Sequence, residues 1–422
     1  MLSKVKKGIK KMIIKKTALL LLLLVFLSGN LNLNRINIDY SIEIRYLLFL
    51  AFVSITSIVL LNRRQKSLNT GLNSSTLIFL LAIFTYLLLV INSIFYTIDQ
   101  SAVLGKSISM LFLVPLIIGI LFIVCNMELR EFFSFITVFF IIVGIVYATP
   151  IYLSVFLGAD RGDVNLSGPN VATRILFFAA CSSIYRFLLN KKTLYFILII
   201  LFLFSIVLVG SRGGLVGAFL TLLFLLAARR SFKARKNKIG ITMNYKYLLF
   251  LPLGLGTLFL IYKPVKRVFM DRVIGTTFSN DTVYTAGRDI IYGDALKMIK
   301  EKPLFGYGID SFTTYTGHVY PHNLLLEMMV EIGLIGAIIF GIFVFFSIII
   351  IFKMRKSSLY ILSGTPLYMI IVQMFSGEFY DFRYFFLWVI PFLHYGFTTQ
   401  FESLNTHKEI GDFKKNTSKS LN

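Results

Sequence analysis

Long apolar runs separated by short polar connections extend along most of the chain. The runs 46–61, 194–209 and 334–352 contain no charged side chain. They approach or match the length at which an α-helix crosses a hydrocarbon core of about 30 Å. Because a soluble core does not need uninterrupted apolar segments of this length, the pattern predicts an all-α polytopic membrane protein.

The apolar runs and the charges that flank them predict about twelve membrane helices. Their expected ranges are 17–33, 44–61, 76–95, 103–125, 132–157, 171–189, 193–211, 213–228, 245–262, 323–352, 358–376 and 384–399. The basic N-terminal segment resembles a signal peptide, but it lacks a good cleavage site. It therefore predicts an uncleaved first membrane helix.

The spacing of these runs divides the chain into four expected regions. Residues 1–262 hold the first nine membrane helices, and residues 263–322 form one large extracytoplasmic loop. Residues 323–399 hold the last three membrane helices, and residues 400–422 form a cytoplasmic tail. Most connections are short, so a loop of about sixty residues is unusual and is expected to carry function.

Charge adds an orientation to this pattern. The chain is 57% hydrophobic and 15% charged, with a formal net charge of +23. Connections rich in lysine and arginine alternate with connections that are poor in both, as the positive-inside rule describes. Both termini are therefore expected in the cytoplasm. The basic balance does not indicate nucleic-acid binding, because no aromatic-interleaved basic module or zinc pattern accompanies it.

The long loop is not low in complexity. Its segment 287–303, GRDIIYGDALKMIKEKP, places apolar residues at helical spacing and stops at a proline. This arrangement predicts an amphipathic helix followed by a turn in LFGYGIDSF. A structured loop on one face of a membrane bundle is a place where a binding or catalytic site is expected.

Two arginines lie at the predicted outer boundary. Arg212 stands between two apolar segments with Gly213 and Gly214 behind it, and Arg288 lies in the segment that predicts the loop helix. The ordinary alternatives are an interfacial arginine for the first and a solvated surface arginine for the second. Against these alternatives, the outer side is where the positive-inside rule disfavours arginine.

Two further stretches place polar residues at the same boundary. His322 and Asn323 precede an apolar helix that carries Glu327 and Glu331 on successive turns. Carboxylates in a membrane segment are costly, so these two glutamates are expected to pair with arginine or another polar group and to support the site. The second stretch, 160–174, contributes three candidate substrate-binding residues, Arg161, Asn170 and Arg174.

These residue types share one chemistry. Arginine forms two-pronged contacts with phosphate oxygens, and histidine removes a proton from a hydroxyl near neutral pH. An outer-leaflet anion beside a general base points to a lipid diphosphate and a sugar hydroxyl. The outer loops have no clustered carboxylates of the kind that hold Mg²⁺, so we predict no metal site.

The motifs together resemble the superfamily of O-antigen ligases and Wzy-type polysaccharide polymerases. The resemblance rests on SRGG, on the loop GRDIIYGDALKMIKEKPLFGYGIDSF, on PHNLLLEMMVEIGLIG and on RGDVNLSGPNVAT, within residues 160–336. It implies a glycosyltransferase-C-like bundle in a bacterial cytoplasmic membrane. It also implies His322 as the catalytic base, Arg212 and Arg288 as diphosphate-binding residues, and no metal or nucleotide-sugar cofactor.

The resemblance leaves the exact reaction open. We expect polymerisation of undecaprenyl-diphosphate-linked repeat units into a surface polysaccharide, by an inverting transfer at the outer face. The alternative within the family is transfer of a finished glycan to another acceptor. A lipid-linked oligosaccharide flippase and a non-enzymatic assembly protein are more distant alternatives. The expected partners are the lipid-linked donor, a glycan acceptor and the bilayer, with the flippase and chain-length regulator of the same pathway as further candidates.

Overall fold

The computed structural model describes residues 2–28, 47–56, 72–99, 103–157, 167–233, 287–318, 320–376 and 379–396. Within these ranges every regular element is a helix. The α-helices are α1 (Leu2–Ser28), α3 (Ser74–Asn92), α4 (Val103–Asn126), α5 (Leu129–Phe156), α6 (Pro169–Asn190), α7 (Thr193–Val209), α8 (Arg212–Lys233), α11 (Arg288–Glu301), α12 (Ser311–Thr316), α13 (Leu324–Met354), α14 (Thr365–Gln373) and α15 (Arg383–Gly396). Short 3₁₀ turns cover η2 (Ser93–Phe95), η5 (Ser358–Tyr360), η6 (Leu362–Gly364) and η7 (Phe379–Phe382).

Six of the described helices are long and apolar enough to cross a membrane. They are Ser74–Phe95, Lys106–Asn126, Leu129–Val155, Pro169–Asn190, Arg212–Arg229 and Leu324–Met354. Three shorter apolar helices accompany them, at Leu47–Thr56, Thr193–Val209 and Ser358–Gln373. These helices support the predicted all-α membrane protein. The count of twelve stays a prediction, because the expected span 245–262, residues 263–286 of the loop and the tail 400–422 lie outside the described residues.

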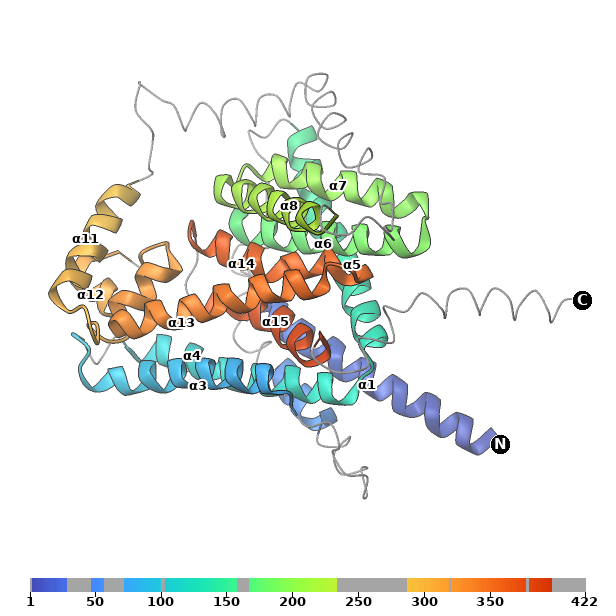
Figure 1. Ribbon diagram of the computed structural model, residues 1–422, viewed down its shortest axis with the longest axis horizontal. Helices are drawn as coiled ribbons and strands as arrows, with labels where there is room; N and C mark the ends of the chain where they lie inside the picture. The colour runs from blue at the N-terminus through green and yellow to red at the C-terminus, as the bar shows by residue number, and fades with distance from the viewer. Residues whose placement is uncertain are drawn as a thin grey trace, which may run out of the picture.

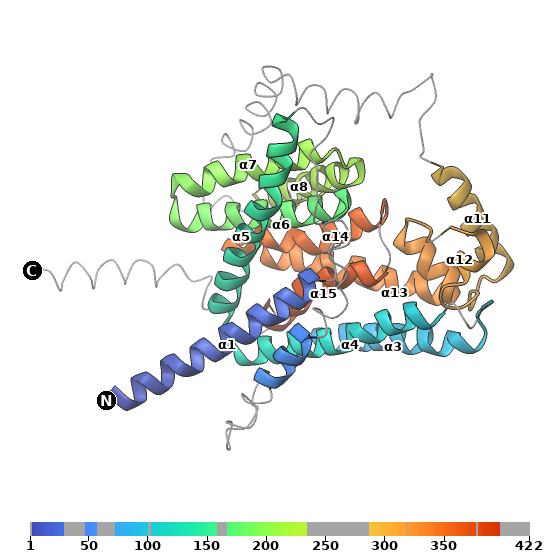
Figure 2. The ribbon, with the colours of Figure 1, turned by 180° about the vertical axis from the view of Figure 1, so that it is seen from behind.

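The helices form a bundle in which α13, α14 and α15 run through the middle (Figures 1 and 2). On one side α13 packs against α3 and α15 packs against α4. On the other side α14 packs against α8, and α6 packs against both α5 and α7. The helices α11 and α12 lie together at one end of the bundle, which we call the α11 end.

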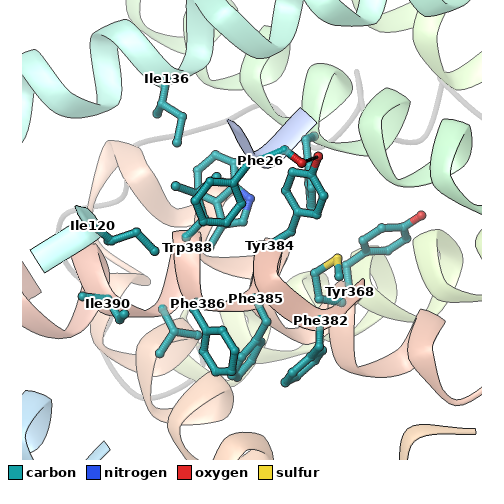
Figure 3. Close-up of a cluster of buried hydrophobic side chains, with 14 of the residues drawn as sticks. Phe26, Ile120, Ile136, Tyr368, Phe382, Tyr384, Phe385, Phe386, Trp388 and Ile390 are labelled. Atoms are coloured by element: carbon teal, nitrogen blue, oxygen red, sulfur yellow. Dashed lines mark hydrogen bonds between the residues drawn. The ribbon is translucent and has the colours of Figure 1, made fainter. Parts of the chain in front are cut away.

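The core is densest around α15. Every residue from Arg383 to Tyr395 is buried, although the helix has only 14 residues. Its aromatic side chains interlock with neighbouring helices (Figure 3). Trp388 stacks on Phe140 of α5 with 5.5 Å between ring centroids, and Phe382 stacks on Phe385 at 4.2 Å. The burial of these residues places α15 inside the bundle, among the longer helices.

Helix α13 is broken near its start. Ile332 has φ −130° and ψ 17°, and Gly333 has φ 64° and ψ −147°, so a segment of two turns precedes the break. The freed carbonyls of Val330 and Glu331 accept hydrogen bonds from the N–H groups of Tyr307 and Gly308, at 2.7 and 3.0 Å. Helix breaks persist where other backbone groups satisfy the released carbonyls, and the segment 303–309 supplies them here.

Gly333 is required at this break. Its φ lies in the left-handed region, and a Cβ there would lie 2.3 Å from the backbone of Leu304. Glycine is the residue that tolerates both conditions. The N–H of Leu334 then donates to the carbonyl of Pro303 at 2.8 Å, so the segment 303–309 is bonded to both sides of the break.

The amphipathic helix predicted within 287–303 is confirmed as α11. Its buried residues Ile291, Ala295 and Met298 pack with Phe312 of α12 and Val330 of α13. The helix begins directly after Gly287, whose φ of 74° favours glycine, and ends just before Pro303. This packing fixes the start of α11 beside the first turns of α13.

Candidate functional site

His322 lies in the short connection between α12 and α13. Its backbone is in the left-handed region with φ 55°, which is uncommon outside glycine, and its side chain is half-buried. The ring of Tyr320 lies against the imidazole, with 4.3 Å between ring centroids. The backbone conformation and the neighbouring ring together fix where the imidazole points.

The protonation of His322 follows from its surroundings. Partial burial and the positive charges of Arg288 and His318 lower the pKa of its imidazole below the ordinary value. The neutral form therefore dominates at neutral pH, and a neutral imidazole can accept a proton.

Asn323 has a structural task in this arrangement. It is the N-cap of α13, and its side-chain oxygen accepts a hydrogen bond from the N–H of Leu326 at 3.2 Å. An N-cap of this kind satisfies one of the free N–H groups at a helix start. Since the side-chain oxygen is used in this cap, the predicted contact of Asn323 with substrate would use its amide nitrogen.

Arg212 begins α8 at a crowded junction. A Cβ at Gly213 would lie 2.6 Å from Phe375, and a Cβ at Gly214 would lie 2.3 Å from Thr173 of α6. The preceding residue, Ser211, donates a hydrogen bond to Asn170 Oδ1 at 2.6 Å. The glycines after Arg212 therefore let the start of α8 approach α6 and the residues that follow α14.

The turn 374–376 connects the two predicted arginines. Asn170 donates from its Nδ2 to the hydroxyl of Ser376, which holds this turn against α6. From the other side, the hydroxyl of Tyr292 in α11 reaches the carbonyl of Met374 at 3.5 Å. The helix starts that carry Arg212 and Arg288 thus both contact this one turn, although they are 76 positions apart in the sequence.

Arg174 is buried in the bundle. It belongs to a group that we call the arginine cluster, made of Arg174, Asp381 and Arg383. Arg174 Nη2 pairs with Asp381 Oδ2 at 2.9 Å, and Arg383 Nη1 pairs with Asp381 Oδ1 at 3.3 Å. Burial raises the pKa of Asp381, but the two guanidinium groups overcome this and hold that pKa below its ordinary value. Arg174 is only 2% exposed, and its Nε and Nη1 atoms make no hydrogen bond to any residue that the structure describes.

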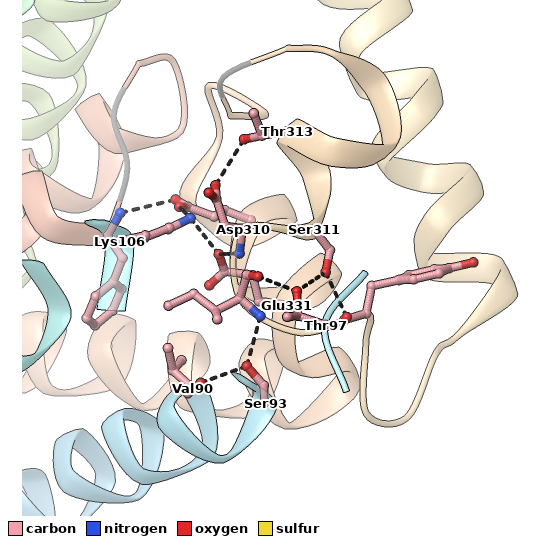
Figure 4. A network of polar contacts seen from close by, with 12 residues as sticks. Val90, Ser93, Thr97, Lys106, Asp310, Ser311, Thr313 and Glu331 are labelled. Atoms are coloured by element: carbon pink, nitrogen blue, oxygen red, sulfur yellow. Dashed lines mark hydrogen bonds and ion pairs between the residues drawn. The ribbon is translucent and has the colours of Figure 1, made fainter. Parts of the chain in front are cut away.

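Glu327 and Glu331 meet a lysine that the sequence analysis did not single out. Lys106 Nζ lies 2.6 Å from Glu327 Oε1 and 2.5 Å from Glu331 Oε1 (Figure 4). We call these three residues the lysine cluster. The glutamates were expected to pair with arginine or another polar group, and the cation that bridges them here is a lysine from α4.

Backbone groups complete the lysine cluster. The N–H of Phe379 donates to Glu327 Oε2 at 3.1 Å, and the N–H of Asp310 donates to Glu331 Oε1 at 3.2 Å. Nearby, Ser93 and Thr97 at the end of α3 bind the backbone of Ile309 (Figure 4). The cluster therefore joins α4 and α13 to the turns that precede α12 and α15.

The sequence analysis did not single out Lys106, Asp381 or Arg383, although the position of each in the sequence is unusual for a charged residue. Lys106 begins an apolar run on the side where lysine is sparse, and Asp381 and Arg383 stand between two apolar segments. Such charges are costly in a membrane segment unless they are paired. The partners of Lys106 lie 221 and 225 positions away, and Asp381 pairs with Arg174 at 207 positions, so the signal marks the residues without naming these pairs.

Metal ligands were not expected, and the described ranges hold no group of three or more His, Cys, Asp or Glu side chains suited to a metal ion. Arg161, predicted as a substrate-binding residue, lies outside the described residues. The α11 end thus combines a half-buried imidazole, two arginines at helix starts, and two buried ion clusters. Such a set can bind an anion and accept a proton.

Comparison with known proteins gives one family. A family model described as O-antigen ligase matches residues 197–341. No curated protein matches the chain. The matched stretch includes Arg212, Arg288 and His322, whereas Asn170 and Arg174 precede it. Residues 197–341 are thus similar to the O-antigen ligase family, in a chain whose described part holds six helices long and apolar enough to cross a membrane.

Proposed function

We propose that the protein transfers a glycan from a polyprenyl-diphosphate carrier to a sugar hydroxyl, as a polymerase that joins repeat units of a bacterial surface polysaccharide. A ligase or polymerase type of activity agrees with the family match. The observation that carries the proposal is the half-buried His322, held against the ring of Tyr320 directly before α13, in a stretch that the O-antigen ligase model matches. The proposed donor is undecaprenyl-diphosphate-linked oligosaccharide.

In this mechanism His322 removes the proton from the acceptor hydroxyl as that oxygen attacks the anomeric carbon of the donor. Attack opposite the leaving group inverts the configuration at that carbon. Arg212 and Arg288 bind the diphosphate and stabilise the charge that grows on it as the bond breaks. The residues alone supply the base and the cationic groups, so the proposed reaction needs no metal.

Asn170, Arg174 and Asn323 are proposed to bind substrate around this centre. Two guanidinium nitrogens of Arg174, Nε and Nη1, have no hydrogen-bond partner among the described residues, which gives the side chain a capacity for an additional acceptor. Asn170 lies in the network that holds the turn 374–376. Glu327 and Glu331 are proposed to support the site, because both are buried and paired with Lys106.

A strain that lacks the gene separates polymerase from ligase. Single repeat units on their carrier or acceptor are expected for a polymerase, whereas free polymer that is not attached to an acceptor would indicate a ligase. Loss of lipid-linked units from the outer face would instead indicate a flippase. Loss of polymer in a His322→Ala strain with an unchanged protein level excludes a purely assembling role.

The proposed site is extracytoplasmic, and labelling of single cysteines tests this. In a background without Cys125 and Cys181, Lys297→Cys in α11 is expected to react with an impermeant reagent added to intact cells. Lys192→Cys, in the turn between α6 and α7 at the opposite end of the bundle (Figures 1 and 2), is expected to stay unlabelled. The reverse pattern would contradict both the orientation and the mechanism.

A further inference from the structure

Lys106 is the central residue of a buried contact between distant parts of the chain. Its side chain is 12% exposed and lies between two carboxylates that are each 2% exposed. The residues that it joins are 221 and 225 positions away in the sequence. A lysine so placed in a membrane helix is expensive unless the contact has a task.

The contact reaches four elements. Glu327 and Glu331 lie on α13, and Lys106 lies on α4. The N–H of Phe379, before α15, binds Glu327, and the N–H of Asp310, before α12, binds Glu331. One lysine therefore holds the two carboxylates that also bind the turns on either side of the site.

The broken helix gives this contact its importance. The break at Ile332 and Gly333 separates the first two turns of α13 from the rest of the helix. The position of these turns is set by what binds them from the sides, since the helical hydrogen bonds do not continue regularly through the break. Glu327 and Glu331 lie on these two turns, and His322 and Asn323 stand directly before them.

We propose that Lys106 is a positioning residue for the reaction: through Glu327 and Glu331 it fixes the first two turns of α13, and so it fixes where His322 stands. This inference rests on the proposed function, because it gives His322 the role of base. Lys106 touches neither substrate nor base in this account. Its effect is transmitted by a segment of about two turns, and a displacement near 1 Å at a reacting group lowers a rate by about 100-fold.

The alternative role for Lys106 is to neutralise the two buried carboxylates so that the protein folds. Both roles predict that Lys106→Met destabilises the protein. The two roles predict different rates for the protein that does fold. Only the positioning role predicts a slower reaction per folded molecule. The two roles also predict different rates for the double variant Lys106→Met/Glu331→Gln. This variant removes one carboxylate together with the lysine and leaves Glu327 bound to the N–H of Phe379.

The experiment compares purified wild type, Lys106→Met, Lys106→Arg, Lys106→Met/Glu331→Gln and the control Lys297→Met, which removes an exposed lysine of α11. Transfer is measured with a synthetic polyprenyl-diphosphate oligosaccharide and a soluble acceptor, per folded protein. For both methionine variants kcat is expected to fall about 10- to 100-fold with donor affinity near wild type. Lys106→Arg is expected to recover most of the rate, since a guanidinium can bind both carboxylates.

A second readout does not depend on activity. The NMR signals of ring-labelled histidine are recorded for the same variants, and the His322 signal is assigned by its absence in His322→Ala. This signal is expected to move in both methionine variants and to return in Lys106→Arg. An unmoved signal with a wild-type kcat in the folded double variant would overturn the inference, as would failure of both methionine variants to fold.

The two proposals fail in different ways. If wild type is inactive with the lipid-linked donor, or if His322→Ala is active, the proposed function fails whatever Lys106 does, and the NMR readout still decides whether Lys106 positions His322. If wild type is active and His322→Ala is inactive but the Lys106 variants react normally, only the role of Lys106 fails.

Discussion

The two buried ion clusters have opposite composition. The lysine cluster sets one cation between two carboxylates, and backbone N–H groups bind both carboxylates. The arginine cluster sets one carboxylate between two guanidinium groups, and the Nε and Nη1 atoms of Arg174 have no hydrogen-bond partner within the described ranges. Among the described residues, the first cluster has two carboxylates to one cation, and the second has two guanidinium groups to one carboxylate.

The difference in composition suits the two clusters to different roles, one in supporting the site and one in binding substrate. In the lysine cluster three of the four carboxylate-oxygen positions are used, and Glu331 Oε2 alone makes no hydrogen bond. An additional anion would be repelled there. In the arginine cluster the unused groups are donors, so an additional anion or hydroxyl would be stabilised. The lysine cluster therefore fits a role in holding the site, and the arginine cluster fits a role in binding substrate.

The largest expected effect is on stability, in Asp381→Asn compared with Glu331→Gln. Asp381→Asn removes the carboxylate that pairs with both Arg174 and Arg383, so the unfolding free energy is expected to fall by about 3–5 kcal/mol. Glu331→Gln leaves Lys106 paired with Glu327, and a smaller loss is expected. Thermal unfolding of the two purified variants measures the difference. Equal losses would mean that the clusters do not differ in the way described.

The comparison is sharpened by Arg212 and Arg288, which lie in neither cluster. Arg212→Lys and Arg288→Lys are each expected to slow transfer by about 100-fold or more, because lysine cannot make a two-pronged contact with diphosphate oxygens. The rates are measured with a lipid-linked donor, and Lys297→Arg, an exchange in the opposite direction on the surface of α11, is the control. Full activity in either lysine variant would assign that arginine to a surface role.

A smaller effect is expected for Arg174→Lys. Lysine keeps one ion pair with Asp381 but removes the N–H groups that are available for substrate. Donor affinity is expected to weaken about 10-fold, or about 1.4 kcal/mol, with a modest change in kcat. Titration with lipid-linked donor measures this. If affinity is unchanged while stability falls, the arginine cluster is structural in the same sense as the lysine cluster.

The smallest effect is a change in pH dependence. The pKa of His322 is lowered by partial burial, by Arg288 and by His318. Activity is therefore expected to persist below the ordinary histidine range and to fall as His322 becomes protonated. His318→Gln removes one cause of the lowering, so the acid limb of kcat should move to higher pH. An unchanged limb in this variant would show that His318 does not influence the base.

Much of the helical architecture was predictable, because apolar length and amphipathic spacing are local properties. The segment that became α11 carried its apolar face, its starting glycine and its terminating proline within 17 residues. The break in α13 was not predicted, because Gly333 lies within an apolar run. Its cause, the segment 303–309 bound to the freed carbonyls, is a tertiary contact.

The candidate residues of the site could be named from the sequence, whereas the contacts between them could not. Arg212 and Arg288 stood out because the positive-inside rule disfavours arginine on the outer side, and His322 stood out because it precedes a membrane helix that carries two glutamates. Lys106 did not stand out, because it reads as the end of a polar connection, and its partners are on another helix. Helical spacing shows which face of a helix carries a charge, but it does not show which helix faces it.

The most direct test of the account is the rate of transfer by His322→Ala and Glu327→Gln, as folded purified enzymes with lipid-linked donor. If His322 is the base, His322→Ala is expected to lose about 100- to 10,000-fold in rate while it still binds donor. Glu327→Gln is expected to retain measurable transfer, because the amide oxygen can still accept the N–H of Phe379. Full transfer by His322→Ala with an inactive Glu327→Gln would show that the base is a carboxylate and would contradict the account.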